Sequence, residues 1–274
     1  MKKTFIILLI VILGSNINLL AQGDLLITPK RVVFENNKHR KEMLNLVNIG
    51  NDTAVFSISF VNYRMNEEGD FIKIEEEDSL HMFSSPYLRV FPRTVTLAPR
   101  EPQVVALQYR KKPNMKAGEY RSHLYFRSEK KTKPLGEDER GDTTKLKIQL
   151  IPIFGLSIPI IVRTGEVNVT STISNLEIKM ELDTIPYLYF YLNRKGNLSI
   201  YGSIMVDYYP EEGKAYQVGI INGLGVYTDI EKRACAVKLN LSPGTKLEKG
   251  KLKIRFTNDD PINRKIYAET ELDL

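Results

Sequence analysis

The segment from Lys145 to Thr164 constrains the fold of this chain most strongly, and it reads KLKIQLIPIFGLSIPIIVRT. Its beginning alternates polar and apolar residues, which is typical of a strand with one apolar face. From Ile151 to Val162 it is almost continuously apolar. Pro152 and Pro159 exclude a long helix and remove two donors of a strand ladder, so we expect a strand at a sheet edge or one that switches sheets.

The stretch before this segment, Lys130–Thr144, is charged and almost without apolar residues (KKTKPLGEDERGDTT). We expect it to be a loop. An apolar edge strand beside such a loop is an aggregation hazard unless another chain pairs with the strand. The combination therefore indicates a binding function for this edge.

The N-terminus has the organisation of a secretory signal peptide, which we place at residues 1–21. Lys2 and Lys3 precede an apolar stretch, Phe5–Leu13, and Ala21 is a small residue at the expected cleavage point. The apolar stretch is shorter than the roughly 20 residues that cross a bilayer, and no later segment is expected to span one. Export, and the mixing of basic with acidic residues along the chain, argue against nucleic-acid binding.

The remaining sequence favours an all-β fold of two domains. Short runs rich in Val, Ile, Tyr and Thr recur every 8–15 residues or so, without a convincing amphipathic helix, which favours a β-sandwich. The pattern restarts after Thr164, so we predict domains at 24–164 and 165–274. Within the second, the glycine-rich Gly219–Gly225 is expected to form a hairpin turn, and Cys235, the single cysteine, a buried thiol.

No catalytic or metal-binding pattern is present in the sequence. His39, His81 and His123 are far apart and form no paired ligand motif. The consecutive acids Glu75–Asp78 are better explained as a solvated loop than as a cation site. No nucleophile or phosphate-binding motif occurs. We therefore expect neither an enzyme nor a cofactor.

Three pieces of sequence, together with the charged loop, resemble the PapD-like periplasmic chaperones of pilus and fimbrial assembly. They are ITPKRVVFE near the mature start, GEYRSHLYF, and IPIIVR at the end of the apolar segment. The resemblance implies two Ig-like β-sandwiches in a boomerang arrangement with a cleft between them. It implies a periplasmic location and secreted pilus or fimbrial subunits as partners.

In that family the last strand of the first domain, with the loop before it, lends apolar side chains to an incomplete subunit, which is donor-strand complementation. The resemblance places the donors on one parity: Leu146, Ile148, Leu150, Pro152 and Phe154. The alternative for these residues is that they face the protein's own core. For the following apolar residues of the same parity we prefer that alternative: Leu156, Ile158, Ile160 and Val162.

The resemblance also assigns roles to charged residues. Arg31 matches an arginine that anchors the subunit's C-terminal carboxylate. The lysine that accompanies it in the family falls on Pro159, so Lys30 is a candidate substitute in the inter-domain cleft. Arg163 matches an arginine of an inter-domain ion-pair network, whose acidic partner is replaced by Arg121, two residues from Glu119.

These features predict a periplasmic chaperone that acts by donor-strand complementation through Leu146–Phe154. The alternative is a two-domain Ig-like structural or interaction protein of the cell envelope that chaperones nothing, which the missing lysine favours. An outer-membrane usher and self-association through the edge strand stay open as further partnerships.

Overall fold

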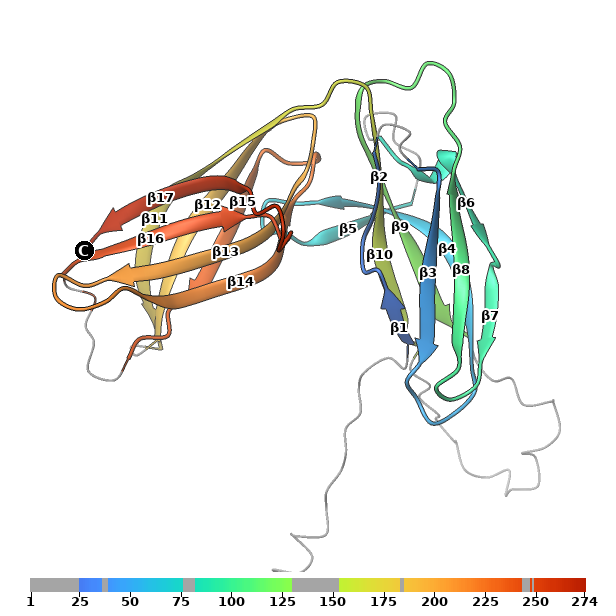
Figure 1. The fold of residues 1–274 in the computed structure, drawn as a ribbon, viewed down its shortest axis with the longest axis horizontal. Coiled ribbons are helices and arrows are strands. Elements are labelled where there is room, and N and C mark those ends of the chain that lie inside the picture. Colours follow the sequence, from blue (N-terminus) through green and yellow to red (C-terminus); the bar gives the residue numbers. More distant parts are fainter. Residues whose placement is uncertain are drawn as a thin grey trace, which may run out of the picture.

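The structure, a computed structural model, is all-β and consists of two β-sandwiches, as predicted (Figure 1). It describes residues 25–35, 39–75, 82–129, 153–182, 185–242, 247 and 249–274. The predicted signal peptide (1–21), the charged loop and the predicted donors Leu146, Ile148, Leu150 and Pro152 lie outside these residues.

The first sandwich packs a four-stranded sheet against a six-stranded sheet. The order in the smaller sheet is β1 (Leu25–Thr28), β3 (Lys41–Asn48), β8 (Pro102–Tyr109) and β6 (Leu88–Phe91). The order in the larger sheet is β2 (Val32–Glu35), β10 (Gly155–Thr164), β9 (Gly118–Ser128), β4 (Ala54–Met65) and β5 (Phe71–Ile74), with β7 (Thr94–Leu97) also paired to β4. A 3-10 turn, η1 (Ser85–Tyr87), precedes β6.

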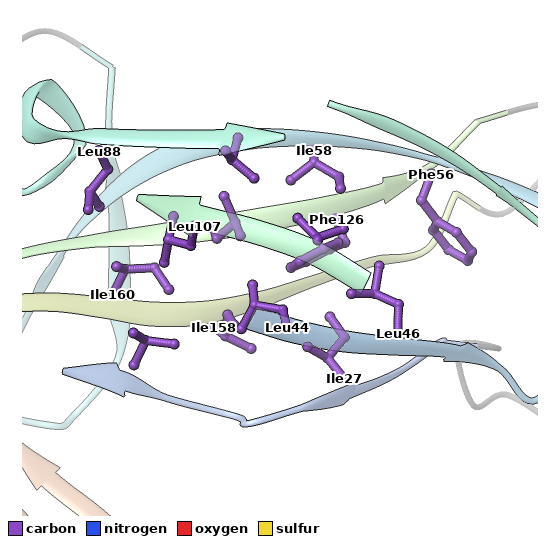
Figure 2. Packing of buried hydrophobic residues seen from close by; sticks show 14 of the residues in the cluster. Ile27, Leu44, Leu46, Phe56, Ile58, Leu88, Leu107, Phe126, Ile158 and Ile160 are labelled. Carbon is purple, nitrogen blue, oxygen red and sulfur yellow. The ribbon is translucent and has the colours of Figure 1, made fainter. Parts of the chain in front are cut away.

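The core of this sandwich is formed by the apolar positions that alternate along its strands, because successive residues of a strand point to opposite faces. Figure 2 shows side chains from strands of both sheets converging between the layers, among them Leu44 and Leu46 of β3 and Ile158 and Ile160 of β10. Ile158, Ile160 and Val162 are buried, which confirms the prediction for these three residues.

The prediction that Leu156 faces the core is wrong, because this residue is 42% exposed although it has the parity of the buried residues. The reason lies in the neighbouring strand. β2 pairs with β10 only from Ile160 to Arg163, so the residues of β10 that precede Ile160 extend beyond it. Leu156 therefore lies where the sandwich opens rather than in its core.

The second sandwich has a three-stranded and a four-stranded sheet. The order in the smaller sheet is β11 (Val169–Glu181), β12 (Ile185–Gly196) and β15 (Lys232–Lys238). The order in the larger sheet is β14 (Tyr216–Val226), β13 (Ile200–Tyr209), β16 (Lys251–Thr257) and β17 (Ile266–Asp273). Its core includes Leu188, Phe190, Ile204 and Phe256. Cys235 is buried in the same core, as predicted.

The prediction of a hairpin turn at Gly219–Gly225 is wrong, because β14 continues through this stretch. The pairing of β14 with β13 shifts register between Gly202 and Ile204. Gly223 has φ +70°, a conformation that favours glycine. A Cβ at Gly219 would lie 3.0 Å from Cγ2 of Val237 in the opposite sheet. The glycines thus serve an irregular strand and a close approach between sheets, rather than a turn.

The two sandwiches meet at one end and diverge at an angle, which is the predicted boomerang arrangement (Figure 1). A small apolar cluster lies at the meeting point: Met65 of β4 and Ile161 of β10 pack with Tyr227, which follows β14. Val33 and Ile230 pack against it. Ile161 has the opposite parity to Ile160, so β10 contributes one face to the first core and the other face to the domain junction.

Candidate functional site

β10 has an edge that faces away from β9 over Gly155–Pro159, here called the outer edge. On its other side β10 pairs with β9 along its whole length, from Gly155 to Thr164. Towards the outer edge it pairs with β2 only from Ile160 onward, and within the described residues Gly155–Pro159 has no strand there. An unpaired stretch of strand of this kind is a template for another extended chain.

A groove of about 500 Å³, here called the edge groove, lies between β1 and the start of β10 and extends to Phe56 of β4 and Ser128 of β9. It is lined mainly by apolar side chains: Leu25, Leu26 and Ile27 of β1, and Phe154, Leu156 and Ile158 around the start of β10. Phe154 is 43% exposed. The structure therefore places one predicted donor, Phe154, and also Leu156 on an exposed apolar surface beside an open strand edge.

A second and smaller hollow of about 210 Å³, here called the junction cavity, lies where the two sandwiches meet. Its lining comes from both sandwiches: Lys30, Arg31, Tyr63, Phe71, His123, Ser157, Pro159, Tyr201 and Tyr227. Lys30 and Ser157 also line the edge groove, so the two hollows adjoin. The predicted anchor Arg31, the candidate Lys30 and the position of the missing lysine, Pro159, are all brought to this cavity.

Arg31 is held in the cavity by uncharged groups of the second sandwich. Its guanidinium donates to the Tyr227 hydroxyl and to Ser199 Oγ, both at 3.4 Å. It also lies over the ring of Tyr201, 4.6 Å from the centroid. None of the ion pairs among the described residues includes Arg31 or Lys30. A guanidinium and an ammonium without a carboxylate partner in the described part of the chain form a place where a carboxylate could make charge-assisted hydrogen bonds.

His123 lies on the wall of the cavity without adding to this positive charge. Its side chain is buried, and its ring packs against Tyr63 and Phe71 with centroids 5.0 Å and 5.3 Å away. Burial, together with the charges of Arg121 and Arg31, lowers the pKa of His123 from 6.5 to about 3. The imidazole is therefore neutral near pH 7, and the cations that line the cavity are Lys30 and Arg31.

Arg163 takes part in a network that crosses the junction through Glu119. Its Nε donates to Glu119 Oε2 at 3.1 Å, and its Nη1 donates to Glu35 at 3.0 Å. The buried Glu119 also accepts the backbone N–H of Ser199 in the second sandwich at 3.2 Å. The sequence singled out Glu119 only as a neighbour of Arg121, whereas the structure makes it the direct partner of Arg163.

Arg121 makes a second crossing of the junction. Its guanidinium pairs with the carboxylate of Asp229 from the second sandwich and donates to the Tyr63 carbonyl at 2.9 Å. Asp229 also accepts the backbone N–H of Met65 at 2.9 Å. Arg121 lies over the ring of Tyr227, 3.9 Å from the centroid. β9 is thus tied to the second sandwich by two buried charged residues, Glu119 and Arg121.

Sequence reasoning missed the aromatic residues of the cavity. Tyr63, Phe71, Tyr201 and Tyr227 come from separate parts of the chain and from both sandwiches. In β9 polar residues alternate with apolar ones in the sequence, and the structure shows that Glu119, Arg121 and His123 are all buried. Charged residues are seldom buried unless paired, so such a strand indicates contact with a second layer or domain.

Within the described ranges, no group of three His, Cys, Asp or Glu residues is arranged to hold a metal ion. No helix of the described part of the chain is long and apolar enough to cross a membrane.

No protein-family model matches the sequence, and no curated protein matches it. Solved structures do match. The YadV chaperone is 12% identical, with 92% of this chain and 100% of that chain covered and a TM-score of 0.45. The CsuC–CsuE chaperone–tip adhesion subunit complex of Acinetobacter baumannii is 12% identical, with 91% and 98% covered and a TM-score of 0.46. The CupB2 chaperone of Pseudomonas aeruginosa is 13% identical, with 91% and 100% covered and a TM-score of 0.43. The chain is similar to these chaperones along most of its length.

Proposed function

We propose that the protein is a periplasmic chaperone that binds an extended segment of a secreted pilus or fimbrial subunit along the outer edge of β10. The observation that carries this proposal is the combination of an open strand edge, exposed apolar side chains and two cations without carboxylate partners among the described residues. The periplasmic location rests on the predicted signal peptide at residues 1–21.

Strand addition explains how such an edge would hold a subunit. The backbone of an extended segment pairs with the edge, and side chains of alternate residues enter an apolar groove. Phe154 and Leu156, both more than two-fifths exposed, would be covered by the subunit. Fully burying one such side chain contributes roughly 1.5–3 kcal/mol. The predicted donors Leu146, Ile148, Leu150 and Pro152 precede these residues and extend the same strand in the proposal.

The junction cavity would hold the end of the subunit. Arg31 would donate two hydrogen bonds to the C-terminal carboxylate, and Lys30 would supply the second cation that the family takes from the position of Pro159. Lys30 lines both hollows, so a strand that runs along the edge groove reaches the anchor at the end of its path. No cofactor enters this scheme, because strand pairing and apolar burial supply the binding energy.

The test is recovery of partners from the native periplasm with the tagged mature protein and two variants, Leu156→Asp and Arg31→Ala. Ile220→Asp is a matched control, because Ile220 is similarly exposed (47%) but lies on β14 of the second sandwich. We expect a small secreted protein in a one-to-one ratio, lost with both variants and kept with the control. A large partner that is insensitive to both variants would favour the alternative, a structural protein of the cell envelope.

A further inference from the structure

The junction cavity has aromatic walls in addition to its cations. Tyr63 and Phe71 from the β4–β5 hairpin and His123 of β9 form one wall, and Tyr201 and Tyr227 of the second sandwich form the other. The volume of about 210 Å³ is below the roughly 300–1,000 Å³ of sites that take drug-sized ligands. The cavity is therefore of a size for one side chain rather than for a larger ligand.

The rings of the first wall meet edge to face, which is the arrangement that aromatic rings favour. The ring planes of Tyr63 and Phe71 lie at 87° and 73° to that of His123. Phe71 remains 46% exposed although it is a large apolar residue that lines a cavity. A further ring that entered the cavity would cover this surface and extend the same cluster.

The charges of the cavity decide which kind of aromatic ligand fits. Aromatic walls often bind cations, but here guanidinium groups already lie over three of the rings. Arg31 lies over Tyr201, and Arg121 lies over Tyr227 and Phe71. Arg121 is paired with Asp229, so the cations of the cavity without a carboxylate partner among the described residues are Arg31 and Lys30, and His123 is neutral. A cationic ligand would be repelled, whereas an aromatic group that carries a carboxylate matches both the walls and the charge.

We propose that the junction cavity binds the last residue of the bound subunit and selects an aromatic C-terminal residue with a free carboxylate. The inference rests on the proposed function, since it names the ligand chemistry of the same anchor. Arg31 and Lys30 hold the carboxylate, and the side chain of the terminal residue packs against Phe71 and Tyr63. Tyr201 and Tyr227 hold Arg31 in place from the second sandwich.

The test uses pentapeptides that differ only in their last residue, Phe or Ala, each with a free or an amidated C-terminus. Binding to the mature protein is measured by NMR titration to millimolar peptide. We expect the Phe-terminated acid to bind at least tenfold more tightly than the Ala-terminated acid, because the ring buries more apolar surface. Amidation and Arg31→Ala are each expected to weaken binding of the Phe-terminated acid at least tenfold, since either change removes the charged pair.

Phe71→Leu separates the aromatic wall from the charged anchor. It is expected to reduce the Phe-to-Ala preference severalfold while the dependence on the free carboxylate persists. Phe91→Leu, at an exposed phenylalanine on β6, is the matched control and is expected to change neither. Equal binding of the Phe- and Ala-terminated acids, with the carboxylate still required, would overturn the aromatic selection and leave the proposed anchor intact. Binding that ignores both amidation and Arg31→Ala would overturn the anchor as well.

Discussion

Asp229→Asn is the sharpest test of how the two sandwiches are held together. Asp229 accepts hydrogen bonds from Arg121 and from the backbone N–H of Met65, both in the first sandwich. The Arg121 and Asp229 side chains are only 4% and 11% exposed. Asparagine has nearly the same shape and keeps an oxygen for the Met65 N–H, but it removes the negative charge. The substitution therefore leaves Arg121 as a buried cation without its counter-ion.

The expected cost follows from the burial of this pair. Removing one partner of a buried ion pair typically destabilises a protein by about 3–5 kcal/mol. Arg121 keeps its hydrogen bond to the Tyr63 carbonyl and its position over the Tyr227 ring, which stabilise the remaining cation. We therefore expect a loss of about 3 kcal/mol, the lower end of that range, from the free energy that holds the two sandwiches together.

Asp207→Asn is the matched control. Asp207 pairs with Arg255 inside the second sandwich, where the two side chains are 16% and 33% exposed. Because this pair is closer to solvent and does not cross the junction, its loss is expected to cost about 1 kcal/mol. It should not alter the relation between the two sandwiches.

The assay is urea unfolding followed by tyrosine emission, since the chain has 14 tyrosines and no tryptophan. Small-angle scattering of the folded variants reports how the sandwiches are disposed. We expect Asp229→Asn to split unfolding into separate transitions and to broaden the distribution of interatomic distances, whereas Asp207→Asn does neither. If Asp229→Asn unfolds in the same single transition as Asp207→Asn, and at a similar cost, the pair does not hold the junction and the reasoning is refuted.

Two further predictions concern buried titratable groups. The pKa of His123 is lowered to about 3, so the unfolded state takes up its proton first, and stability is lost as pH falls from about 6.5 towards 3. The free energy of unfolding should be about 2 kcal/mol lower at pH 5 than at pH 7, and His123→Phe should abolish this difference. The same pH dependence in the variant as in the parent protein would contradict the prediction. Burial raises the pKa of the Cys235 thiol to about 11, so a thiol reagent at pH 7.5 should modify the native protein far more slowly than the urea-unfolded protein. Equal rates would show that Cys235 is accessible.

The alternation of residues in the sequence was sufficient to predict the sandwiches, but not where a strand stops being covered. Ile158 and Leu156 have the same parity and the same chemistry, and only Ile158 is buried. The difference depends on the end of the pairing between β2 and β10, which is a tertiary property. The prediction of a hairpin turn at Gly219–Gly225 was wrong for a related reason. These glycines accommodate a register shift between strands and a close approach of the opposite sheet, and neither can be read from the presence of glycine in a sequence.

The charged residues of the site could be proposed from the resemblance, because Arg31 and Lys30 lie in a short segment of recognisable order. The aromatic walls could not. Tyr63, Tyr201 and Tyr227 are three of 14 tyrosines, and nothing local to each one indicates that it faces another domain. Their convergence is produced by the angle between the sandwiches.

The open edge and the cations beside it have one structural cause. β1 pairs with β3 in the smaller sheet, whereas β2 pairs with β10 in the larger sheet, so the chain crosses between the sheets at residues 29–31. This crossing takes β1 away from β10 and leaves the outer edge beside the groove. It also places Lys30 and Arg31, which belong to the crossing itself, at the end of that edge. A substitution that straightened the crossing would therefore remove the edge and the anchor together, which is why the two features should be tested by separate variants within one fold.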